Sequence, residues 1–402
     1  MRAGWAIKPL ADVCQIKPSK AEARSRISDK GLVSFMPMED LGIDQKYLVP
    51  TRTETLSEVA GSYTYFADGD VLLAKITPCF ENGKLGIANN LTNGIGFGSS
   101  EYIVFRPSPE IDKEWLYYFL SQESFRVEGA ERMTGAVGHK RITKEFIESY
   151  PIPVPPLPEQ HRIVAILDAA FDGITTAKAN AEQNLQNACA LFESHLQKVF
   201  TERGEGWVDS TVGEHIRFID YRGKTPEKTQ SGLRLITAKN VKMGYVQPEP
   251  AEFVAPKSYD GWMTRGIPQR GDVLFTTEAP LANVAQLDTD EKVVFAQRII
   301  IMQPDRTKLD CTFLKYLLLS QPVQQRIHEK GTGATVKGIK ASLLRTIEIS
   351  FPRSLKVQLG IVTKLDSLSA ETQRLESLYQ QKLAALDGLK KSLLHQAFSG
   401  AL

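Results

Sequence analysis

Gln160-His161-Arg162-Ile163-Val164-Ala165-Ile166-Leu167-Asp168 is a stretch that the chain repeats near its other end, as Gln358-Leu359-Gly360-Ile361-Val362-Thr363-Lys364-Leu365-Asp366. The two copies match without a gap, because 361 − 163 and 365 − 167 both equal 198. Self-similarity at one fixed separation marks an internal repeat, and such a repeat decides the architecture. The chain therefore has two halves, each a globular segment followed by one of these stretches.

Both copies predict long helices. Each follows a proline-containing segment, residues 151–158 or 349–352, that ends a strand and suits a helix start. Apolar residues then recur at three- and four-residue steps, as in a coiled coil. In the first copy they are Ile163, Leu167, Ala170, Ile174, Ala177, Ala181, Ala188 and Leu191. In the second they are Ile361, Leu365, Leu368, Leu375, Tyr379, Leu386, Leu389 and Leu393, interrupted only by Thr372 and Lys382.

We expect helices over residues 158–202 and 356–402 that pack on each other, since the small residues of the first copy permit close approach. The alternative is a long helix folded onto its own globular domain. The gapless repeat and a length of about 60 Å for 40 residues argue against it.

The composition is ordinary for a globular protein, and 402 residues predict two or three domains. No apolar run is long enough to cross a bilayer, and the first residues lack the apolar region of a signal peptide. The four cysteines are scattered without a C-x-x-C pair, which favours a reducing cytoplasm over disulfides or structural zinc. The net charge of +2 argues neither for nor against nucleic acid, so DNA binding would depend on local charge.

The two globular segments share a series of markers, which predicts an α/β domain in each half. They are a Gly-Trp start (4–5 and 206–207), a turn into an apolar strand (69–73 and 271–275), a strand ended by proline (102–107 and 299–304), a short amphipathic helix (115–120 and 313–318) and a glycine-rich loop (134–141 and 332–340). Between these markers the halves differ, which suggests two modules of one kind that read different things. The run at 94–98 resembles a cofactor loop, but its strand–loop–strand context predicts a turn.

Candidate DNA contacts lie in the glycine-rich loops, which carry Lys140 and Arg141 in one half and Lys337 and Lys340 in the other. Glycine lets the backbone approach an anion, and a basic side chain neutralises it. An ordinary connection before the next strand is the alternative. In the turn Tyr221-Arg222-Gly223-Lys224, arginine could read a guanine edge and lysine could hold phosphate; an exposed basic turn is nearly as probable. Weaker candidates at strand ends and loops are Lys75, Asn82, Lys84, Lys239, Asn240 and Arg298.

Catalytic motifs are missing from the sequence. It has no phosphate-binding loop of the G-x-x-x-x-G-K-[ST] type and no Asn- or Asp-Pro-Pro-aromatic tetrapeptide, the motif of adenine methyltransferases. Its single Pro-Asp lacks the acidic-x-lysine that a nuclease would add, and the histidines fall at no metal-ligand spacing. We therefore expect a non-catalytic chain without a cofactor or metal of its own.

In this order and number, the motifs resemble those of the specificity subunits of type I restriction–modification systems, over essentially the whole chain. The resemblance rests on the two recognition segments, the Pro-Pro-Leu-Pro-Glu-Gln-His-Arg-Ile-Val opening at 155–164 and its degenerate second copy. Supporting motifs are Gly69-Asp70-Val71-Leu72, Met133-Thr134-Gly135 and the C-terminal run at 393–400. The second copy departs from the pattern, because Pro352–Gln358 replaces Pro-Leu-Pro-Glu-Gln; we expect an altered helix start there.

The resemblance implies two tandem α/β target-recognition domains separated by two long helices, packed as an antiparallel coiled coil with a pseudo-twofold internal repeat. The divisions would be 1–157 for the first recognition domain, 158–204 for the central helix, 205–353 for the second recognition domain and 354–402 for the C-terminal helix. It also implies a cytoplasmic subunit that reads a bipartite site in double-stranded DNA and has no membrane partner. Its partners would be two modification subunits, S-adenosylmethionine-dependent adenine methyltransferases, and motor–nuclease restriction subunits.

Two other functions stay open at the level of the sequence. The chain could be the recognition module of a related single-chain restriction enzyme, although its missing catalytic motifs count against activity. It could also be a coiled-coil adaptor that never touches nucleic acid. Salt-dependent, sequence-selective DNA binding in the presence of a methyltransferase partner would separate these functions.

Overall fold

The structure is a computed structural model that describes residues 4–136, 138–221, 225–296, 298–333 and 336–402. The chain divides into two compact units. Unit 1 comprises Met1–Glu182 and Gln381–Leu402, and unit 2 comprises Gln183–Gln380. Each unit therefore contains one globular part, the beginning of one long helix and the end of the other.

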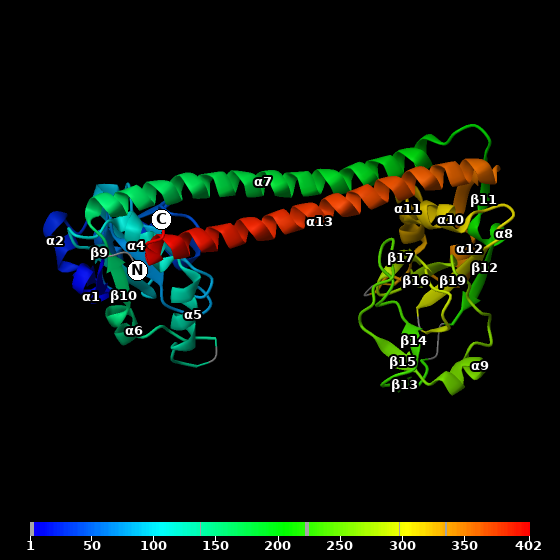
Figure 1. The fold of residues 1–402 in the computed structure, drawn as a ribbon, viewed down its shortest axis with the longest axis horizontal. Coiled ribbons are helices and arrows are strands. Elements are labelled where there is room, and N and C mark those ends of the chain that lie inside the picture. The colour runs from blue at the N-terminus through cyan, green and yellow to red at the C-terminus, as the bar shows by residue number, and fades with distance from the viewer. Residues whose placement is uncertain (1–3, 137, 222–224, 297, 334–335) are drawn as a thin grey trace. The chain divides into compact units, whose positions relative to one another are not determined.

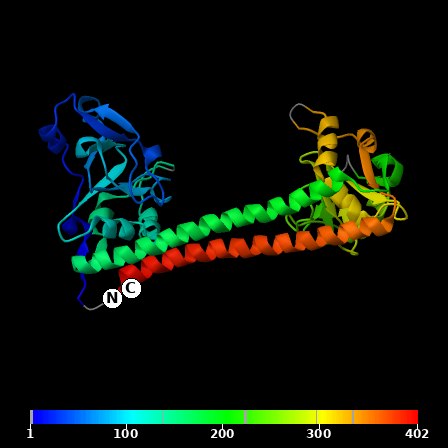
Figure 2. The ribbon, with the colours of Figure 1, turned by 90° about the horizontal axis from the view of Figure 1, so that it is seen from above.

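The two long helices are α7, Leu157–Glu202, and α13, Leu355–Ser399. Both begin one residue before the predicted start. In unit 1, the start of α7 lies beside the end of α13, and Lys178 Nζ is 2.7 Å from Asp387 Oδ1. In unit 2 the end of α7 lies beside the start of α13, where Cys189 Sγ donates to Glu376 Oε1 at 2.9 Å. The expected antiparallel pairing is confirmed in each unit (Figures 1 and 2).

The predicted apolar seam of the helices is correct over most of its length but wrong at one repeated position. Leu191 and Leu389, which are 198 residues apart, are 59% and 47% exposed, whereas Thr372, expected to interrupt the seam, is buried. A straight helix drifts by about 20° per heptad relative to a strict seven-residue pattern. Near its end each helix also turns its buried face toward a globular part, through Leu196 and Phe200 in α7 and Leu394 and Phe398 in α13.

In unit 1, two four-stranded sheets and a two-stranded ribbon form the globular part. The first sheet is antiparallel and has the order β2 (Cys14–Ile16), β9 (Tyr102–Pro107), β6 (Val71–Ala74) and β7 (Leu85–Ile87). The second has the order β4 (Arg52–Thr55), β3 (Leu32–Met36), β8 (Ile95–Gly98) and β5 (Thr64–Ala67), with β3 and β8 parallel. The ribbon pairs β1 (Ala6–Pro9) with β10 (Pro151–Val154), the strand that leads into α7.

Unit 2 (Figure 1) repeats the antiparallel sheet and the ribbon, whereas its second sheet has a different strand order. Its antiparallel sheet has the order β12 (Ile216–Asp220), β19 (Ile299–Pro304), β16 (Val273–Thr277) and β17 (Leu281–Gln286). Its second sheet has the order β13 (Lys228–Thr229), β15 (Glu252–Val254), β14 (Leu233–Ile236) and β18 (Val293–Phe295), with β14 and β18 parallel. The ribbon pairs β11 (Trp207–Thr211) with β20 (Glu348–Pro352), the strand before α13.

Short helices complete both units. In unit 1 they are α1 (Leu10–Val13), α2 (Ala21–Arg26), α3 (Leu56–Val59), α4 (Lys113–Leu120), α5 (Glu123–Glu131) and α6 (Lys144–Ser149), with 3-10 turns η1 (Met38–Asp40) and η2 (Thr92–Gly94). In unit 2 they are α8 (Val212–His215), α9 (Tyr259–Trp262), α10 (Cys311–Leu319), α11 (Gln321–Lys330) and α12 (Ala341–Arg345), with the turn η3 (Pro256–Ser258). The predicted α/β class is confirmed; the predicted domain limits stay a prediction.

Residues 94–98 correct the sequence analysis, because the expected turn is confined to η2 and the run continues as the buried strand β8. Gly96 has a packing role there: a Cβ at this position would lie 2.2 Å from Cε2 of Phe66 on the adjacent strand. A glycine within a strand often marks such a close approach.

Each core is built from the sheet, a capped helix and the ends of both long helices. Asp112 and Asp310 cap α4 and α10 by accepting hydrogen bonds from the second and third backbone amides. In unit 1, Trp115 packs between Trp5 and Phe398, with ring centroids 5.8 and 4.4 Å away. The matching cluster in unit 2 joins Phe313 to Trp207 and Phe200. In the part of the chain that the structure describes, none of the helices has the length and apolarity of a membrane span.

Candidate nucleic-acid interface

The glycine-rich loop of unit 1 is a closed turn with a basic end. Thr134 and Arg141 each donate a backbone N–H to the other's carbonyl, at 3.0 and 2.8 Å. Gly135, at the turn, has φ of 125°, a conformation that glycine adopts at low cost. The Thr77 N–H donates to the Lys140 carbonyl at 3.0 Å, which fixes the loop against the segment that follows β6. Lys140, next to the closing residue Arg141, is exposed.

Two candidates far apart in the sequence, Lys75 and Arg141, meet at Glu101. Arg141 donates through Nε and Nη2 to both Glu101 carboxylate oxygens, at 2.9 and 2.8 Å. Lys75 Nζ lies 3.8 Å from Glu101 Oε2 and donates to the Ser100 carbonyl at 2.9 Å. The hydrogen bond from Arg141, followed by the charge of Lys75, lowers the pKa of Glu101. Glu101 therefore holds two cations side by side at the start of β9.

The loop of unit 2 has the same closure with different charges. Thr332 and Gly338 exchange backbone hydrogen bonds at 2.8 and 2.9 Å. The Thr277 N–H donates to the Arg298 carbonyl at 2.8 Å, as the Lys75 N–H does to the Glu101 carbonyl at 2.9 Å. Arg298 therefore occupies the position of Glu101, and its Nε lies 3.1 Å from Glu278 Oε1. At the same backbone position, unit 1 has an acidic side chain and unit 2 has a basic one.

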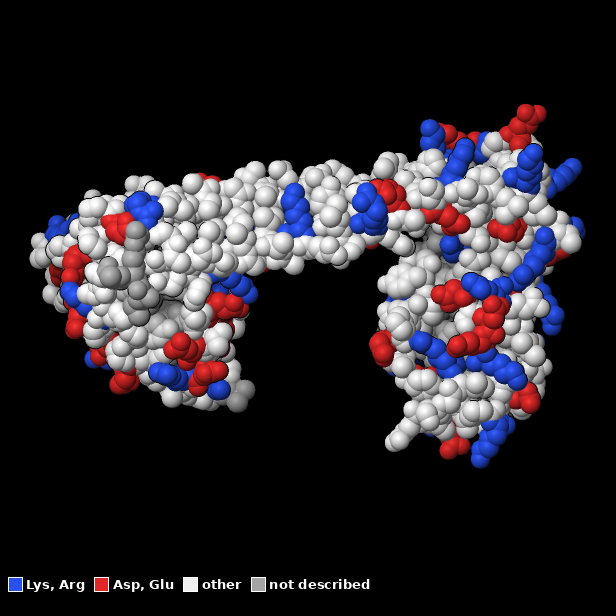
Figure 3. All heavy atoms as spheres, viewed as in Figure 1, with Lys and Arg blue, Asp and Glu red and all other residues white. Residues whose placement is uncertain are grey.

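Four lysines on three loops are exposed to solvent and have no ion pair among the described residues. They are Lys140, Lys239, Lys337 and Lys340. The loop that displays Lys239 is organised by Asn240, whose buried side chain accepts from the Thr237 N–H at 3.0 Å and donates to the Pro250 carbonyl at 3.1 Å. Such side chains are available to phosphate. Figure 3 shows basic and acidic side chains interspersed on one face of each unit.

Three other candidates differ in whether their side chains are free to contact DNA. Lys84 donates its ammonium to the carbonyls of Met38 and Glu39, at 2.7 and 3.3 Å, and so supports the turn η1. Asn82 is exposed. Tyr221 is buried, donates its hydroxyl to the Gly266 carbonyl at 2.7 Å and accepts from the Arg265 N–H at 3.1 Å, which gives its ring a structural role. Arg222 and Lys224 lie outside the described residues. Contact of the candidate residues with DNA stays a prediction.

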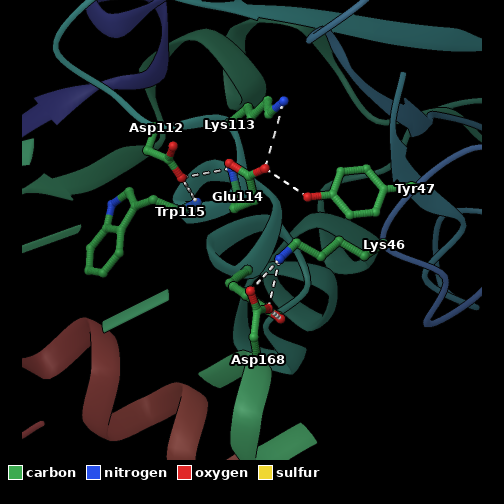
Figure 4. A network of polar contacts seen from close by, with 8 residues as sticks. Lys46, Tyr47, Asp112, Lys113, Glu114, Trp115 and Asp168 are labelled. Carbon is green, nitrogen blue, oxygen red and sulfur yellow. Dashed lines mark hydrogen bonds and ion pairs between the residues drawn. The ribbon is translucent and has the colours of Figure 1, made fainter. Parts of the chain in front are cut away.

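The sequence analysis missed a network that fixes the loop at 41–49 to the helices of unit 1 (Figure 4). Lys46 Nζ donates to both carboxylate oxygens of Asp168 on α7, at 2.7 and 2.8 Å. Next to it, the Tyr47 hydroxyl donates to Glu114 Oε1 on α4 at 2.8 Å. Asp44 Oδ1 lies 2.6 Å from Lys390 Nζ on α13. The loop is therefore bonded to three helices.

The helix side of that network is repeated in unit 2. Tyr118 donates its hydroxyl to Asp168, and Tyr316 donates to Asp366 at 2.6 Å. Burial, and then the hydrogen bond to each carboxylate, raises the pKa of both tyrosines, which keeps them neutral donors.

A buried glutamine also recurs. Gln160 accepts from the Asp112 N–H at 2.8 Å and donates to the carbonyls of Glu110 and Pro155, at 2.9 and 2.8 Å. Gln358 makes the matching bonds with Asp310, Lys308 and Pro352. These residues could have been found as identical side chains 198 positions apart.

The sequence and the fold were compared with those of known proteins, and the matches are to type I restriction specificity proteins. A family profile described as the type I restriction modification DNA specificity domain matches residues 2–186. The EcoAI specificity subunit of a type I restriction enzyme from Escherichia coli is 35% identical over 259 residues, 61% of this chain. The chain spans only 41% of that relative.

Two solved structures share the fold over the whole chain. One is a chain from a study of complex assembly and conformational transition in the type I R-M system, with a TM-score of 0.80, 19% identity and coverage of 100% of this chain and 99% of that chain. The other is the HsdS subunit from Thermoanaerobacter tengcongensis, with a TM-score of 0.66, 19% identity and coverage of 100% and 98%.

Proposed function

We propose that the chain, like the type I restriction–modification specificity subunits that it resembles, selects the DNA sequence for a modification and restriction complex. Each unit reads one half of a bipartite site in double-stranded DNA. The observation that carries the proposal is that equivalent backbone positions of the two units have different charges. Lys75 and Glu101 in unit 1 correspond to Thr277 and Arg298 in unit 2. One scaffold with two different surfaces suits two different half-sites.

Base edges in the major groove supply the sequence information, and contacts to phosphate set the register of each unit on the duplex. The exposed lysines of the two glycine-rich loops, Lys140 in unit 1 and Lys337 and Lys340 in unit 2, suit phosphate contact. Arg141 is already oriented by Glu101, so less of its side-chain freedom is lost when it binds.

The chemistry belongs to partner subunits in this proposal. Two modification subunits bind S-adenosylmethionine and transfer its methyl group to adenine, and motor–nuclease subunits complete the restriction complex. This chain contributes sequence selection and docking through α7 and α13.

The direct test is to express the chain with an adenine methyltransferase partner and to map methylated adenines. We expect the methyltransferase to co-purify, and a bipartite methylated motif that disappears when this chain is omitted. The same complex should bind its motif in preference to other duplexes, with affinity that falls as salt rises. Methylation that is unchanged without the chain, or a chain that binds no DNA in the complex, would instead support the adaptor role.

The paired helices are continuous through the division between the units, which supports a spacer function. Seven residues inserted after Glu182 and seven after Gln380 keep the heptad seam in phase and lengthen the pair by about 10 Å. At about 3.4 Å per base pair, the unread gap in the motif should grow by about three base pairs. Methylome mapping of the double insertion reads this directly, and an unchanged gap contradicts the spacer function.

A further inference from the structure

Unit 1 contains a cleft of about 610 Å³ that the sequence did not reveal. Five stretches of the chain line it: the turn after β2, the entrance to β5, the residue after β6, the start of β9, and the end of the glycine-rich loop together with helix α6. Its basic side chains are Lys17, Lys20, Lys75, Arg141 and Lys144. Glu148 is the acidic side chain among the described lining residues. We call this site the basic cleft.

The acidic groups around the basic cleft neutralise only part of its charge. Glu101 is shared by Arg141 and Lys75, and Glu148 lies 3.3 Å from Lys144 on the next turn of α6. Lys17 and Lys20 have no acidic partner among the described residues. The cations on this side of the cleft are therefore uncompensated, and an anion placed between them would be attracted by both.

The backbone holds Lys17 and Lys20 in place. Lys17 has φ of 58°, unusual for a residue other than glycine, and its N–H donates to the Val104 carbonyl at 2.8 Å. Lys20 Nζ donates to the Gly61 carbonyl at 2.9 Å. Burial lowers the pKa of Lys20, and repulsion from Lys17 and Arg24 adds to that effect. A bound anion would oppose the repulsion.

Unit 2 differs at positions that matter to the cleft. Thr277 stands where unit 1 has Lys75, and Arg298 stands where it has the acidic Glu101. The first residue of α12 is Ala341, whereas α6 begins with Lys144. At these positions the repeat therefore preserves the backbone hydrogen bond or helix start without preserving the charges.

We infer that the basic cleft binds a phosphate group of the DNA backbone, with Lys17 and Lys20 as its positioning residues. The inference rests on the proposed function, and it assigns to unit 1 a phosphate contact on residues that neither the glycine-rich loop nor the strand-end candidates include. Phosphate contacts fix register without reading bases. The contact should therefore contribute affinity and salt dependence to unit 1 without changing the sequence that it selects.

The test compares salt dependence in the complex of the full chain with its modification subunits. One variant carries Lys17→Gln and Lys20→Gln. A second carries Lys17→Arg and Lys20→Arg, which keep the charge. The matched control carries Lys30→Gln and Lys113→Gln, two lysines of unit 1 outside the cleft lining. Binding to a duplex with the mapped motif and to a duplex without it is measured over a range of salt concentrations.

We expect the double glutamine variant to lower the slope of log affinity against log salt by about 1 for both duplexes, since one neutralised phosphate contributes about 0.9. The arginine variant should keep the wild-type slope, the control should change it by less than half as much, and the methylated motif should stay the same. Equal slopes in the glutamine variant and the control would overturn the inference while leaving the proposed function intact.

The two duplexes separate failure of the inference from failure of the function. A wild-type complex that binds neither duplex contradicts both proposals. A wild-type complex that binds both equally contradicts the proposed function alone, and the slope difference still tests the cleft. Inorganic phosphate distinguishes the source of the anion: weak competition shared by all variants supports a DNA phosphate. Tight phosphate binding that the glutamine variant loses without a change in DNA binding would assign the cleft to a free phosphate and overturn the inference.

Discussion

The two units use the same residues where the scaffold is fixed and different residues where it meets solvent. Gln160 and Gln358 are both fully buried and hydrogen-bond two equivalent backbone groups. Each also donates to a proline carbonyl, and this proline lies one position earlier relative to the repeat in unit 2. By contrast, Glu101 and Arg298 occupy one backbone position with opposite charges. The comparison shows that identity across the repeat marks residues that hold the frame, and divergence marks the surface open to change.

The attachment of the globular parts to α7 and α13 also differs between the units. The Asp168 carboxylate accepts hydrogen bonds from Lys46, on the loop at 41–49, and from Tyr118. The Asp366 carboxylate accepts a hydrogen bond from Tyr316. The nearby Nζ of Lys315, which also belongs to α10, lies 4.0 Å from Asp366 Oδ1. Only in unit 1, among the described residues, does a loop of the globular part bond this carboxylate. The tyrosine–aspartate hydrogen bond between helices therefore occurs in both units, whereas the bond from a loop lysine occurs in unit 1.

The largest effect should come from the buried glutamines. Gln160→Ala leaves the Asp112 N–H and the carbonyls of Glu110 and Pro155 without their partner, and an unsatisfied buried group costs about 1–3 kcal/mol. Because the three losses overlap, we expect about 4 kcal/mol of destabilisation in unit 1. Gln358→Ala should cost unit 2 the same within about 1 kcal/mol. Hydrogen exchange followed by mass spectrometry reports each unit separately.

The matched control is Gln183→Ala, since Gln183 is an exposed glutamine of the same helix α7. It should change stability by less than about 0.5 kcal/mol. A loss at Gln160 as small as this control, or a loss in only one of the two units, would show that the frame is not equivalent in the two halves.

An intermediate effect should separate the two aspartates. Asp168→Asn weakens charge-assisted bonds from Lys46, whereas Asp366→Asn mainly weakens one tyrosine bond. We expect about 2 kcal/mol for the first and about 1 kcal/mol for the second. Exchange at residues 41–49 should accelerate in Asp168→Asn and equally in Lys46→Met. If the loop exchanges at the wild-type rate in both variants, Lys46 does not hold it.

The smallest effect concerns pH. Since the pKa of Glu101 is lowered in the folded chain, its ion pairs stabilise unit 1 above the ordinary carboxyl pKa, and this stabilisation is lost as pH falls through the lowered pKa. Glu101→Gln should therefore cost about 1 kcal/mol at neutral pH and nothing in strong acid. Arg298→Gln, whose pair is 47% exposed on both sides, should cost less. Urea unfolding at several pH values tests this; a cost for Glu101→Gln that persists in acid would contradict it.

Much of the frame could be predicted because it depends on local patterns. Proline ends β9 and β19 at the predicted residues, and apolar periodicity located both long helices within a few residues. Leu191 and Leu389 were misplaced because a heptad pattern describes helix-on-helix packing, whereas the ends of these helices pack on globular parts. β8 was missed because glycine lowers strand propensity, and only the ring of Phe66 explains Gly96.

The candidate site was less predictable for a different reason. Lys17, Lys20 and Lys144 are unremarkable in the sequence, and only the tertiary fold brings their two segments to one cleft. Tyr221 looked like part of an exposed basic turn, yet its hydroxyl bonds residues 265 and 266, more than forty positions away. Long-range convergence of this kind leaves no local signal.

The most direct test of the account exchanges one unit's globular part and reads the DNA. Residues 207–352, from β11 to β20, are replaced by the matching segment of a relative, with α7 and α13 unchanged, and methylated adenines are mapped in cells that contain the modification partner. The account predicts that one half of the bipartite motif changes while the other half and the gap stay the same. A motif altered in both halves, or left unaltered, would contradict separate reading by the two units.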